Sequence, residues 1–593
     1  MTDNIFATIR TRVLDALLVL YPDLPAELTA RIDVSPTRDP AHGDMATNAA
    51  MIAAKPARQP PARIAQALAA ALVDASEIAA AEPAGPGFVN IRLQPAALRA
   101  VLPAILQAGE AFGGSTVGQG VRVNVEYVSA NPTGPMHVGH CRGAIVGDAL
   151  ANLMTKAGWT VTKEFYVNDA GNQVAALAWA TYWRYLQAIG TSMTEAEFDA
   201  AAPGGLQYRG DYLVPVGAAL AAAHGDSLAG PNGGVANPAI WLETVRDFAI
   251  DAMLAAIRED LALLGVEHAV FFSERTLIAS GAADAAIAKL QADGLIYEGT
   301  LEPPKGKLPD DWEPREQTLF RSTQFGDDVD RPLRKSDGTN TYFANDIAYH
   351  AEKARNAQLL IDVWGADHGG YVSRMKAATA AITGRTVPLE VVLCQIVRVL
   401  KGGEPVRMSK RAGTFITLRD LLDEVGRDAV RFTMLTRKAD AQMDFDLDAA
   451  VAKTRENPVF YVQYAHARCR SVLRAAAEMP DLPTDSAALA GVALDSLDDE
   501  AELALLRRLA AWPRIVEGAA DAREPHRIAF FLYDLAADFH MLWNRGRDAA
   551  TLRFLQPDRP AETLARLALV AATAVVIRSG LAVMGVTPVE EMR

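Results

Sequence analysis

The chain has 593 residues, 50% of them hydrophobic and 22% charged, and its formal net charge at pH 7 is −14. This composition is that of an ordinary globular protein, and the length predicts about three to five domains because single cores stop growing well below it. The acidic charge excludes a protein that coats nucleic acid nonspecifically, although a local basic stripe can still bind phosphates.

The first part of the chain, residues 1–110, predicts a small α+β module. Residues 5–20 and 60–72 have the apolar spacing of amphipathic helices. A Gly-Pro-Gly turn then leads into a predicted strand over 88–93. The first residues lack the basic and apolar stretches of a signal peptide, so we expect no targeting segment.

Strand-like and helical patterns alternate between residues 111 and 448. This alternation predicts an α/β Rossmann-type doubly wound parallel sheet, with its ligand crevice at the topological switch point. We expect insertions near 185–260 and 300–330. Stretches rich in glycine, proline or charge predict surface loops at 225–238 and 302–316.

The last part, residues 449–593, has only helical patterns and predicts an all-α bundle, with an exposed connection over 480–496. The apolar run 567–577 is shorter than the roughly 20 residues that span a bilayer, so we expect a buried helix and no membrane contact. The three cysteines lie far apart and form no Cys-x-x-Cys pair. We therefore expect neither a structural zinc site nor a disulfide framework, but reduced thiols.

Two short segments carry most of the chemistry. The first, Pro135-Met136-His137-Val138-Gly139-His140, follows a strand-like run and opens a predicted helix over 143–154. N–H groups at a helix N-terminus bind anions. His137 and His140 are three residues apart, so they share a helix face and both can reach phosphate oxygens. Gly139 leaves space for a flat base or ribose.

The second segment is Arg407-Met408-Ser409-Lys410-Arg411. Lys410 supplies a mobile positive charge on a glycine-rich loop, suited to pyrophosphate whose charge grows as its bond to the α-phosphate breaks. Together the two segments indicate a site for a nucleotide triphosphate that is attacked at its α-phosphate. We expect His137, His140 and Lys410 to act as electrostatic stabilisers and not as proton shuttles.

The two segments resemble the HIGH and KMSKS elements of class I aminoacyl-tRNA synthetases, spelled HVGH and RMSKR here. Further segments resemble arginyl-tRNA synthetases, in that family's order and over essentially the whole chain: residues 126–135, 166–173, 337–348, 364–368 and 457–468. One departure is the C-terminus, which reads Glu591-Met592-Arg593 where the family often closes on Arg-Met.

The resemblance implies an arginine–tRNA ligase. Such an enzyme joins L-arginine to AMP from ATP, releases pyrophosphate, and transfers arginine to the terminal adenosine of tRNA. It also implies that adenylate formation needs bound tRNA and that Mg²⁺ arrives with ATP, since this ion prefers substrate phosphates to an all-protein cage. We expect no tightly bound metal, a monomer and a cytoplasmic location.

Arginine selection needs acceptors that match the planar fork of a guanidinium, which a carboxylate does with two parallel bonds. Glu126, Tyr342 and Asp346 match the family's positions for this role. Tyr342 and Asp346 are four residues apart and share a helix face; Asp346 as a mere helix cap is the alternative. The α-amino and carboxylate groups of arginine are assigned to Ser129 and Asn131. Gln395 is assigned a weaker contact with the substrate.

The family's ATP-binding positions correspond to Gly139, Gly365, Asp367, His368, Met408 and Ser409. Asp367 follows a predicted strand and can accept hydrogen bonds from ribose hydroxyls.

The tRNA contacts implied by the resemblance lie at both ends of the chain. Phe88 and Asn90 belong to the N-terminal module, where an exposed aromatic can stack on an unpaired base. Tyr461 and Tyr464 share a helix face and can stack a base whose edge or phosphate Arg468 binds. The alternative for Phe88, Asn90 and the two tyrosines is a purely structural role in their own module.

Other functions were weighed against this one. A synthetase for glutamate or glutamine would need a basic amino-acid pocket, and one for cysteine a thiol-reading metal site. A small nucleotidylyltransferase would not need the two terminal modules. A tRNA-binding paralogue without activity would be expected to lack His137, His140 or Lys410, which are all present.

Overall fold

The structure, a computed structural model, describes residues 4–37, 39–301, 316–335, 337–406, 416–480 and 482–592. The chain forms two compact units, which are described separately: unit 1 consists of Met1–Val117 with Lys453–Arg593, and unit 2 of Gly118–Ala452. The predicted domain boundaries at residues 110 and 448 stay predictions.

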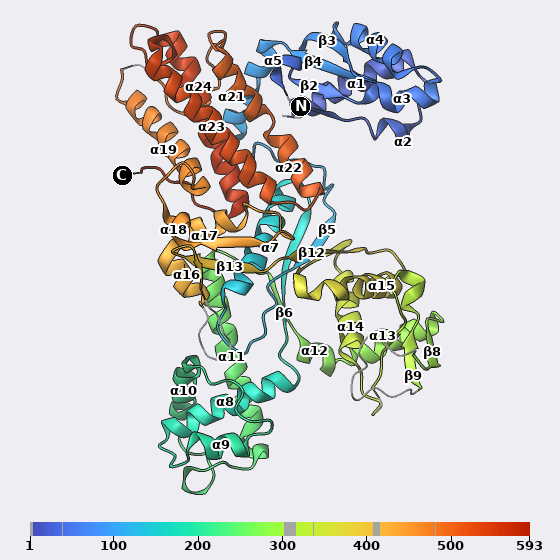
Figure 1. Cartoon of the computed structure of the whole chain (residues 1–593), viewed down its shortest axis with the longest axis vertical. Helices are drawn as coiled ribbons and strands as arrows, with labels where there is room; N and C mark the ends of the chain where they lie inside the picture. Colours follow the sequence, from blue (N-terminus) through green and yellow to red (C-terminus); the bar gives the residue numbers. More distant parts are fainter. Residues whose placement is uncertain are drawn as a thin grey trace. The chain divides into compact units, whose positions relative to one another are not determined.

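A parallel five-stranded sheet forms the centre of unit 2, in the order β12-β11-β5-β6-β7 (Figure 1). Its strands are β5 (Arg122–Glu126), β6 (Thr160–Val167), β7 (Val270–Ser273), β11 (Leu359–Gly365) and β12 (Leu389–Cys394). The chain leaves β5 through β6 and β7, then returns to the other side of β5 with β11 and β12. The strand order therefore reverses between β5 and β11, which confirms the doubly wound fold and predicts a ligand crevice at the carboxyl ends of these strands.

Helix α7 (Val138–Lys156) follows β5 and is buried along most of its length. Its small residues allow close packing on the chain that leaves β5: a Cβ at Gly147 would lie 2.3 Å from the Tyr127 ring. The helix begins earlier than the predicted start at Gly143 because the side chain of His137 caps its first turn.

Along the chain, two groups of elements are inserted between consecutive strands of the sheet. Between β6 and β7 lie α8 (Asn172–Ala188), α9 (Glu195–Ala201), α10 (Val214–His224) and α11 (Pro238–Leu264). Their core is aromatic, with the rings of Tyr182 and Trp241 stacked at a centroid distance of 3.7 Å. Between β7 and β11 lie α12 (Glu274–Ala279), α13 (Ala282–Ala292), β8 (Ile296–Gly299), β9 (Gln317–Phe320), β10 (Arg331–Pro332) and α14 (Tyr342–Ala354). Residues 302–315 of the predicted loop lie outside the described residues.

The rest of unit 2 follows β11 in the chain. Two helical elements, η6 (Ala366–Tyr371) and α15 (Val372–Ile382), lead from β11 to β12. A small sheet with the order β14-β13-β15 follows. The elements of this region are β13 (Val397–Lys401), β14 (Glu404–Pro405), α16 (Leu418–Val425), α17 (Arg427–Met434), β15 (Met443–Asp446) and α18 (Leu447–Val451).

The N-terminal part of unit 1 is the predicted α+β module. Its antiparallel sheet has the order β1-β2-β4-β3. The elements are α1 (Ile5–Leu20), α2 (Ala26–Thr29), β1 (Val34–Pro36), β2 (Met45–Thr47), α3 (Ala49–Ala57), α4 (Pro61–Leu72), β3 (Ile78–Ala84) and β4 (Phe88–Leu93). The predicted helices and strand agree with α1, α4 and β4 because their apolar spacing matches the buried faces.

The C-terminal part of unit 1 is the predicted helical bundle. Its helices are α19 (Pro458–Ala477), α20 (Ser486–Leu489), α21 (Glu500–Ala510), α22 (Trp512–Asp521), α23 (His526–Asp548) and α24 (Pro560–Met584); α5 (Pro95–Arg99) and α6 (Val101–Ala108) pack on α21 and α24. The connection over 480–496 was predicted to be exposed, but it is so only in part, because the buried side chain of Leu489 anchors α20. Helix α24 is long and apolar enough for a membrane span, but 89% of its most apolar window is buried.

Candidate functional site

The HVGH segment lies at the carboxyl end of β5 and forms the first turn of α7. Nδ1 of His137 accepts the N–H of Gly139 at 3.0 Å, and Nδ1 of His140 accepts the N–H of His137 at 3.3 Å. The two rings stack with centroids 3.9 Å apart, so the predicted shared face is present. Two imidazoles and the positive end of a long helix therefore meet at one point, which favours an anion such as a phosphate.

Residues 407–415, with Met408, Ser409 and Lys410, lie outside the described residues. The chain immediately after them pairs with the HVGH segment: Leu418 donates to the carbonyl of Met136 at 2.9 Å, and Val138 donates to the carbonyl of Ile416 at 3.3 Å. The chain that follows the second motif is therefore tied by backbone hydrogen bonds to the N-terminus of α7.

A buried carboxylate fixes this pairing from a third element. Oδ2 of Asp260, on α11, accepts the N–H of Met136 at 3.2 Å, and its Oδ1 accepts from Nε of Arg419, on α16, at 2.7 Å. Asp260 is 1% exposed. Neither side chain was predicted from the sequence, because no motif contains them. The one indication was an acidic residue, Asp260, at a buried position of α11.

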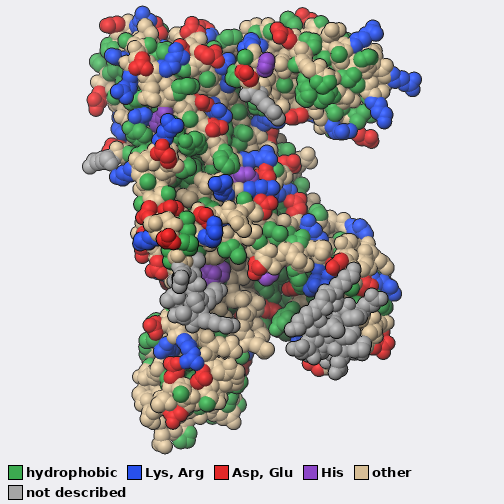
Figure 2. Space-filling model, viewed as in Figure 1, with side chains coloured by type: hydrophobic (Ala, Val, Ile, Leu, Met, Phe, Trp, Pro, Cys, Tyr) green, Lys and Arg blue, Asp and Glu red, His purple; other side chains and the backbone are tan. Residues whose placement is uncertain are grey.

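The predicted adenosine residues follow the neighbouring strand. Gly365 ends β11, and the exposed side chains of Asp367 and His368 come next, with Oδ2 and Nε2 3.7 Å apart. Figure 2 shows histidine side chains exposed on the middle part of unit 2. Ligands of doubly wound sheets bind at this edge.

Gln395 follows β12 and is held by a residue that the sequence analysis missed. Arg142, buried in α7, donates to the carbonyls of Gln395, Ala441 and Lys438 at 2.7–3.0 Å. The guanidinium of Arg142 therefore joins the beginning of α7 to the carboxyl end of β12.

Helix α14 carries two of the predicted arginine ligands. Thr341 caps this helix, so the alternative interpretation of Asp346 as its cap is wrong. Oδ2 of Asp346 accepts from the hydroxyl of Tyr371 at 2.6 Å. Burial raises the pKa of Asp346, while Tyr371 and His350 oppose the rise. Tyr342, one turn earlier, is 66% exposed.

Glu126, the last residue of β5, is not an unpaired carboxylate. Its Oε2 accepts from Nζ of Lys353 at 2.6 Å, and its Oε1 accepts from Oγ of Ser129 at 2.9 Å. Lys353 lies on α14, two turns beyond Asp346, and its side chain is 1% exposed. This lysine was not predicted from the sequence, although its spacing from Asp346 places the two side chains on one face of α14.

Lys353 also binds a second buried carboxylate. Its Nζ donates to Oδ1 of Asp362, on β11, at 2.7 Å, and Nε2 of His350 lies 2.8 Å from Oδ2 of the same group. Burial favours protonation of Asp362, but the charge of Lys353 and the contact with His350 outweigh it and lower the pKa of this carboxyl to about 2. Asp362 is therefore ionised, which keeps a salt bridge beneath Glu126.

The loop after β5 has strained backbone. Val128 and Ser129 have φ angles of 71° and 39°, in a region that β-branched residues avoid. Ser129 is fixed by its bond to Glu126 and by the N–H of Tyr166, which donates to its Oγ at 3.1 Å. Asn131 follows, exposed, and its carbonyl accepts from Thr133 at 2.7 Å. Strain of this kind persists where surrounding bonds over-determine the loop, as at binding sites.

Comparisons with known proteins agree on one family. The chain is 66% identical over all its residues to the arginine–tRNA ligase of Gluconobacter oxydans, covering 98% of that protein. It is 57% identical, over 100% of both chains, to that of Cereibacter sphaeroides. The chain belongs to the arginine–tRNA ligase family.

Parts of the chain also match the models of protein families. Residues 7–93 match the arginyl tRNA synthetase N-terminal domain, 101–195 the catalytic domain of class I (R) tRNA synthetases, and 462–592 the DALR anticodon binding domain.

Solved structures share the fold. An arginyl-tRNA synthetase from Campylobacter jejuni has a TM-score of 0.71 at 30% identity and covers 84% of this chain and 100% of its own. The Thermus thermophilus arginyl-tRNA synthetase has a TM-score of 0.71 at 22% identity, over 99% and 100% of the two chains.

In this member of the arginine–tRNA ligase family, Phe88 and Asn90 lie on the outward face of β4. Val89 and Ile91 alternate with them and are buried, whereas Phe88 is 38% exposed. A role of Phe88 in the module's core is therefore disfavoured, and the predicted tRNA contact of both residues stays a prediction.

The bundle carries the other predicted tRNA residues on α19. The guanidinium of Arg468 donates to the hydroxyl of Tyr464 at 2.9 Å and lies over the Tyr464 and Trp543 rings, at 4.1 and 4.8 Å from their centroids. Tyr461 lies against His540, with ring centroids 4.5 Å apart. These side chains are only partly buried, which leaves faces of the aromatic cluster open to a ligand.

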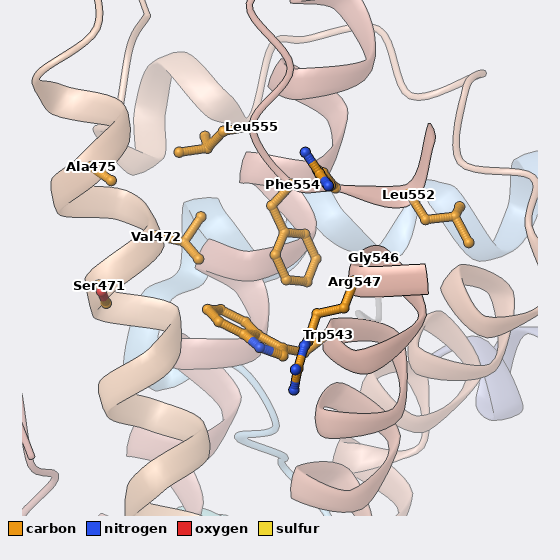
Figure 3. A pocket seen from close by; sticks show the side chains of 10 residues that line it. Ser471, Val472, Ala475, Trp543, Gly546, Arg547, Leu552, Phe554 and Leu555 are labelled. Atoms are coloured by element: carbon orange, nitrogen blue, oxygen red, sulfur yellow. The ribbon is translucent and has the colours of Figure 1, made fainter. Parts of the chain in front are cut away.

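A pocket of about 760 Å³ lies beside this cluster (Figure 3). It is lined by Ser471, Val472, Ala475, Trp543, Gly546, Arg547, Leu552, Arg553, Phe554 and Leu555. Its mixture of aromatic and basic side chains is typical of surfaces that bind unpaired bases. Trp543 was not predicted from the sequence. It could have been indicated by its place near the end of an amphipathic helix, where arginines follow it.

Proposed function

We propose that this protein joins L-arginine to tRNA at the expense of ATP. A carboxylate oxygen of arginine attacks the α-phosphorus, the bond to the β-phosphate breaks, and pyrophosphate leaves. The terminal adenosine of tRNA then attacks the carbonyl carbon of the adenylate through a hydroxyl group, and AMP leaves. A relative that is 66% identical is named arginine–tRNA ligase.

One observation supports this proposal above the others: the backbone pairing of Met136–Val138 with Ile416–Leu418. It brings the flank of the Lys410 segment to the N-terminus of α7, as a reaction at a triphosphate needs. Phosphoryl transfer requires mainly positioning and charge neutralisation. We assign His137 and His140 to the phosphates and Lys410 to the leaving pyrophosphate, with ATP bound as its Mg²⁺ complex.

The amino-acid pocket would be formed where β5 and α14 meet. Glu126 and Asp346 would accept the guanidinium, with Tyr342 at the exposed mouth. Lysine offers only a point charge and leaves one carboxylate oxygen unpaired, which disfavours its binding. The α-amino and carboxylate groups would be held by Ser129 and Asn131, with Gln395 as a weaker contact.

The remaining assignments concern the residues that would bind adenosine and tRNA. Adenosine would bind at Gly139, Gly365, Asp367 and His368, with Met408 and Ser409 on the second motif. tRNA would contact Phe88, Asn90, Tyr461, Tyr464 and Arg468. We propose a monomer that works in the cytoplasm.

ATP–pyrophosphate exchange tests the proposal. Each of the common amino acids is supplied in turn, with and without total tRNA. We expect exchange with arginine alone among the amino acids, and only when tRNA is present. Exchange with another amino acid, or none with arginine and tRNA together, would refute the proposed activity; exchange with arginine in the absence of tRNA would refute only the requirement for tRNA.

A further inference from the structure

The proposed arginine pocket contains an unusual concentration of buried acid. Its ionisable groups come from five elements: Glu126 (β5), Glu164 and Tyr166 (β6), Asp362 (β11), Glu274 (α12), and Asp346, Tyr349 and His350 (α14). Tyr371 of η6 adds a hydroxyl on Asp346. Buried carboxylates this close to one another favour protonation, because like charges repel and burial disfavours the ionised form.

Lys353 is the lysine that lies inside this cluster in the described part of the chain. Its ammonium bridges Glu126 and Asp362, with N–O distances of 2.6 and 2.7 Å. A second network sits beside it: Glu164 accepts from the hydroxyl of Tyr349 at 2.7 Å and from Asn124 at 2.6 Å. The Tyr349 ring lies 4.7 Å from the ammonium. Every carboxylate next to Lys353 is therefore held in one orientation before any ligand arrives.

The two partners of the ammonium differ in a way that suggests a division of roles. Asp362 is 0% exposed and is also bound by His350, so it serves as an internal counter-charge. Glu126 is 8% exposed and lies next to the strained loop at Val128 and Ser129. Only Glu126 of the pair is placed to meet a ligand from the crevice. A salt bridge made merely for stability would not need one partner at the crevice surface.

We propose that Lys353 is a positioning residue of the amino-acid pocket, whose ammonium holds the carboxylate of Glu126 in place for the guanidinium of the substrate. This inference rests on the proposed function. Without the ammonium, Oε2 of Glu126 would lose its partner at 2.6 Å, and the carboxylate would no longer be held in one orientation. Arginine would then have to order this carboxylate in order to bind, which weakens its affinity.

The test is the KM for arginine, compared with kcat, in tRNA-dependent ATP–pyrophosphate exchange, measured for the variant Lys353→Met. We expect this KM to rise about tenfold, as loss of a buried charged partner of the binding carboxylate does. The kcat should change less than the KM, because the ammonium acts on the binding of arginine and not on the reacting atoms. The matched control is Lys289→Met, because Lys289 pairs with Asp293 on the exposed surface of α13.

A second variant separates this role from folding. Lys353→Met combined with Asp362→Asn removes the ammonium and its internal counter-charge together, so no unpaired charge is left at Asp362. The same rise in KM, with a smaller change in kcat, in either folded variant supports the proposal. An unchanged KM, a loss of kcat as large as the rise in KM, or failure of both variants to fold would overturn it.

The outcome also separates this inference from the proposed function. If the wild-type protein shows no arginine-dependent exchange, the proposed function fails. If the wild type is active and both variants keep its KM for arginine, the function stands and Lys353 has no positioning role.

Discussion

The carboxylate of Asp260 offers a direct test of how the HVGH segment is held against the chain that follows the second motif. Asp260→Asn preserves the size of the side chain and one oxygen that can accept the N–H of Met136. It removes the charge that now binds Nε of Arg419 at 2.7 Å. The change therefore weakens the link between α11 and the chain that follows the Lys410 segment, without opening a cavity.

The expected magnitude follows from the surroundings of this bond. A hydrogen bond to a charged partner contributes about 1.5–3 kcal/mol when buried. The Arg419 side chain is 47% exposed, so solvent screening reduces this contribution to about 1–2 kcal/mol. A loss of that size in the reacting geometry corresponds to a rate of arginine activation lower by about 5–30-fold.

The assay is tRNA-dependent ATP–pyrophosphate exchange, together with urea unfolding. Asp251→Asn is the matched control, because Asp251 lies exposed on the same helix. We expect kcat to fall in Asp260→Asn only, with a decrease of about 1–2 kcal/mol in the free energy of unfolding. Wild-type kcat in a variant that has lost this stability would show that the pairing of the two segments does not position the reacting groups.

Further predictions concern single residues. Lys410→Ala should slow activation by about 100-fold or more, as loss of a charge-stabilising donor does, while tRNA affinity measured by filter binding stays unchanged; a normal activation rate would remove Lys410 from the mechanism. Because burial raises the pKa of Asp346 and the guanidinium needs its ionised form, arginine binding should weaken as the pH falls, beginning above the range of an ordinary aspartate. Titration calorimetry checks this, and Asp346→Asn should bind arginine weakly at every pH; a wild-type profile in that variant would exclude Asp346. Trp543→Ala should raise the KM for tRNA by about 5–150-fold if its ring stacks a base, whereas Phe530→Ala, at an exposed position on the same helix, should not; equal effects in the two variants would argue against stacking.

The sequence predicted the elements whose local patterns are strong. The helix over 5–20 has the bounds of α1, and the alternation of strands and helices gave the parallel sheet of unit 2. The capped turn at His137 was only partly predicted, because capping depends on how a side chain folds back onto N–H groups of its own turn.

The side chains that hold the site together could not be predicted from motifs. Asp260, Arg142 and Lys353 each act across elements that are far apart in the sequence. Their partners are often backbone atoms, which leave no residue pattern to read. Glu126 illustrates the consequence: its position was predicted from the family resemblance, but its pairing with Lys353 required the packing of α14 against β5.

The most direct test of the account is a crystal structure of the protein with a non-hydrolysable arginyl-adenylate analogue. We expect the guanidinium at Glu126 and Asp346, the adenosine at the carboxyl ends of β5 and β11, and the phosphate next to His137 and His140. An analogue bound with its guanidinium away from both carboxylates, or its phosphate away from the first turn of α7, would contradict the account.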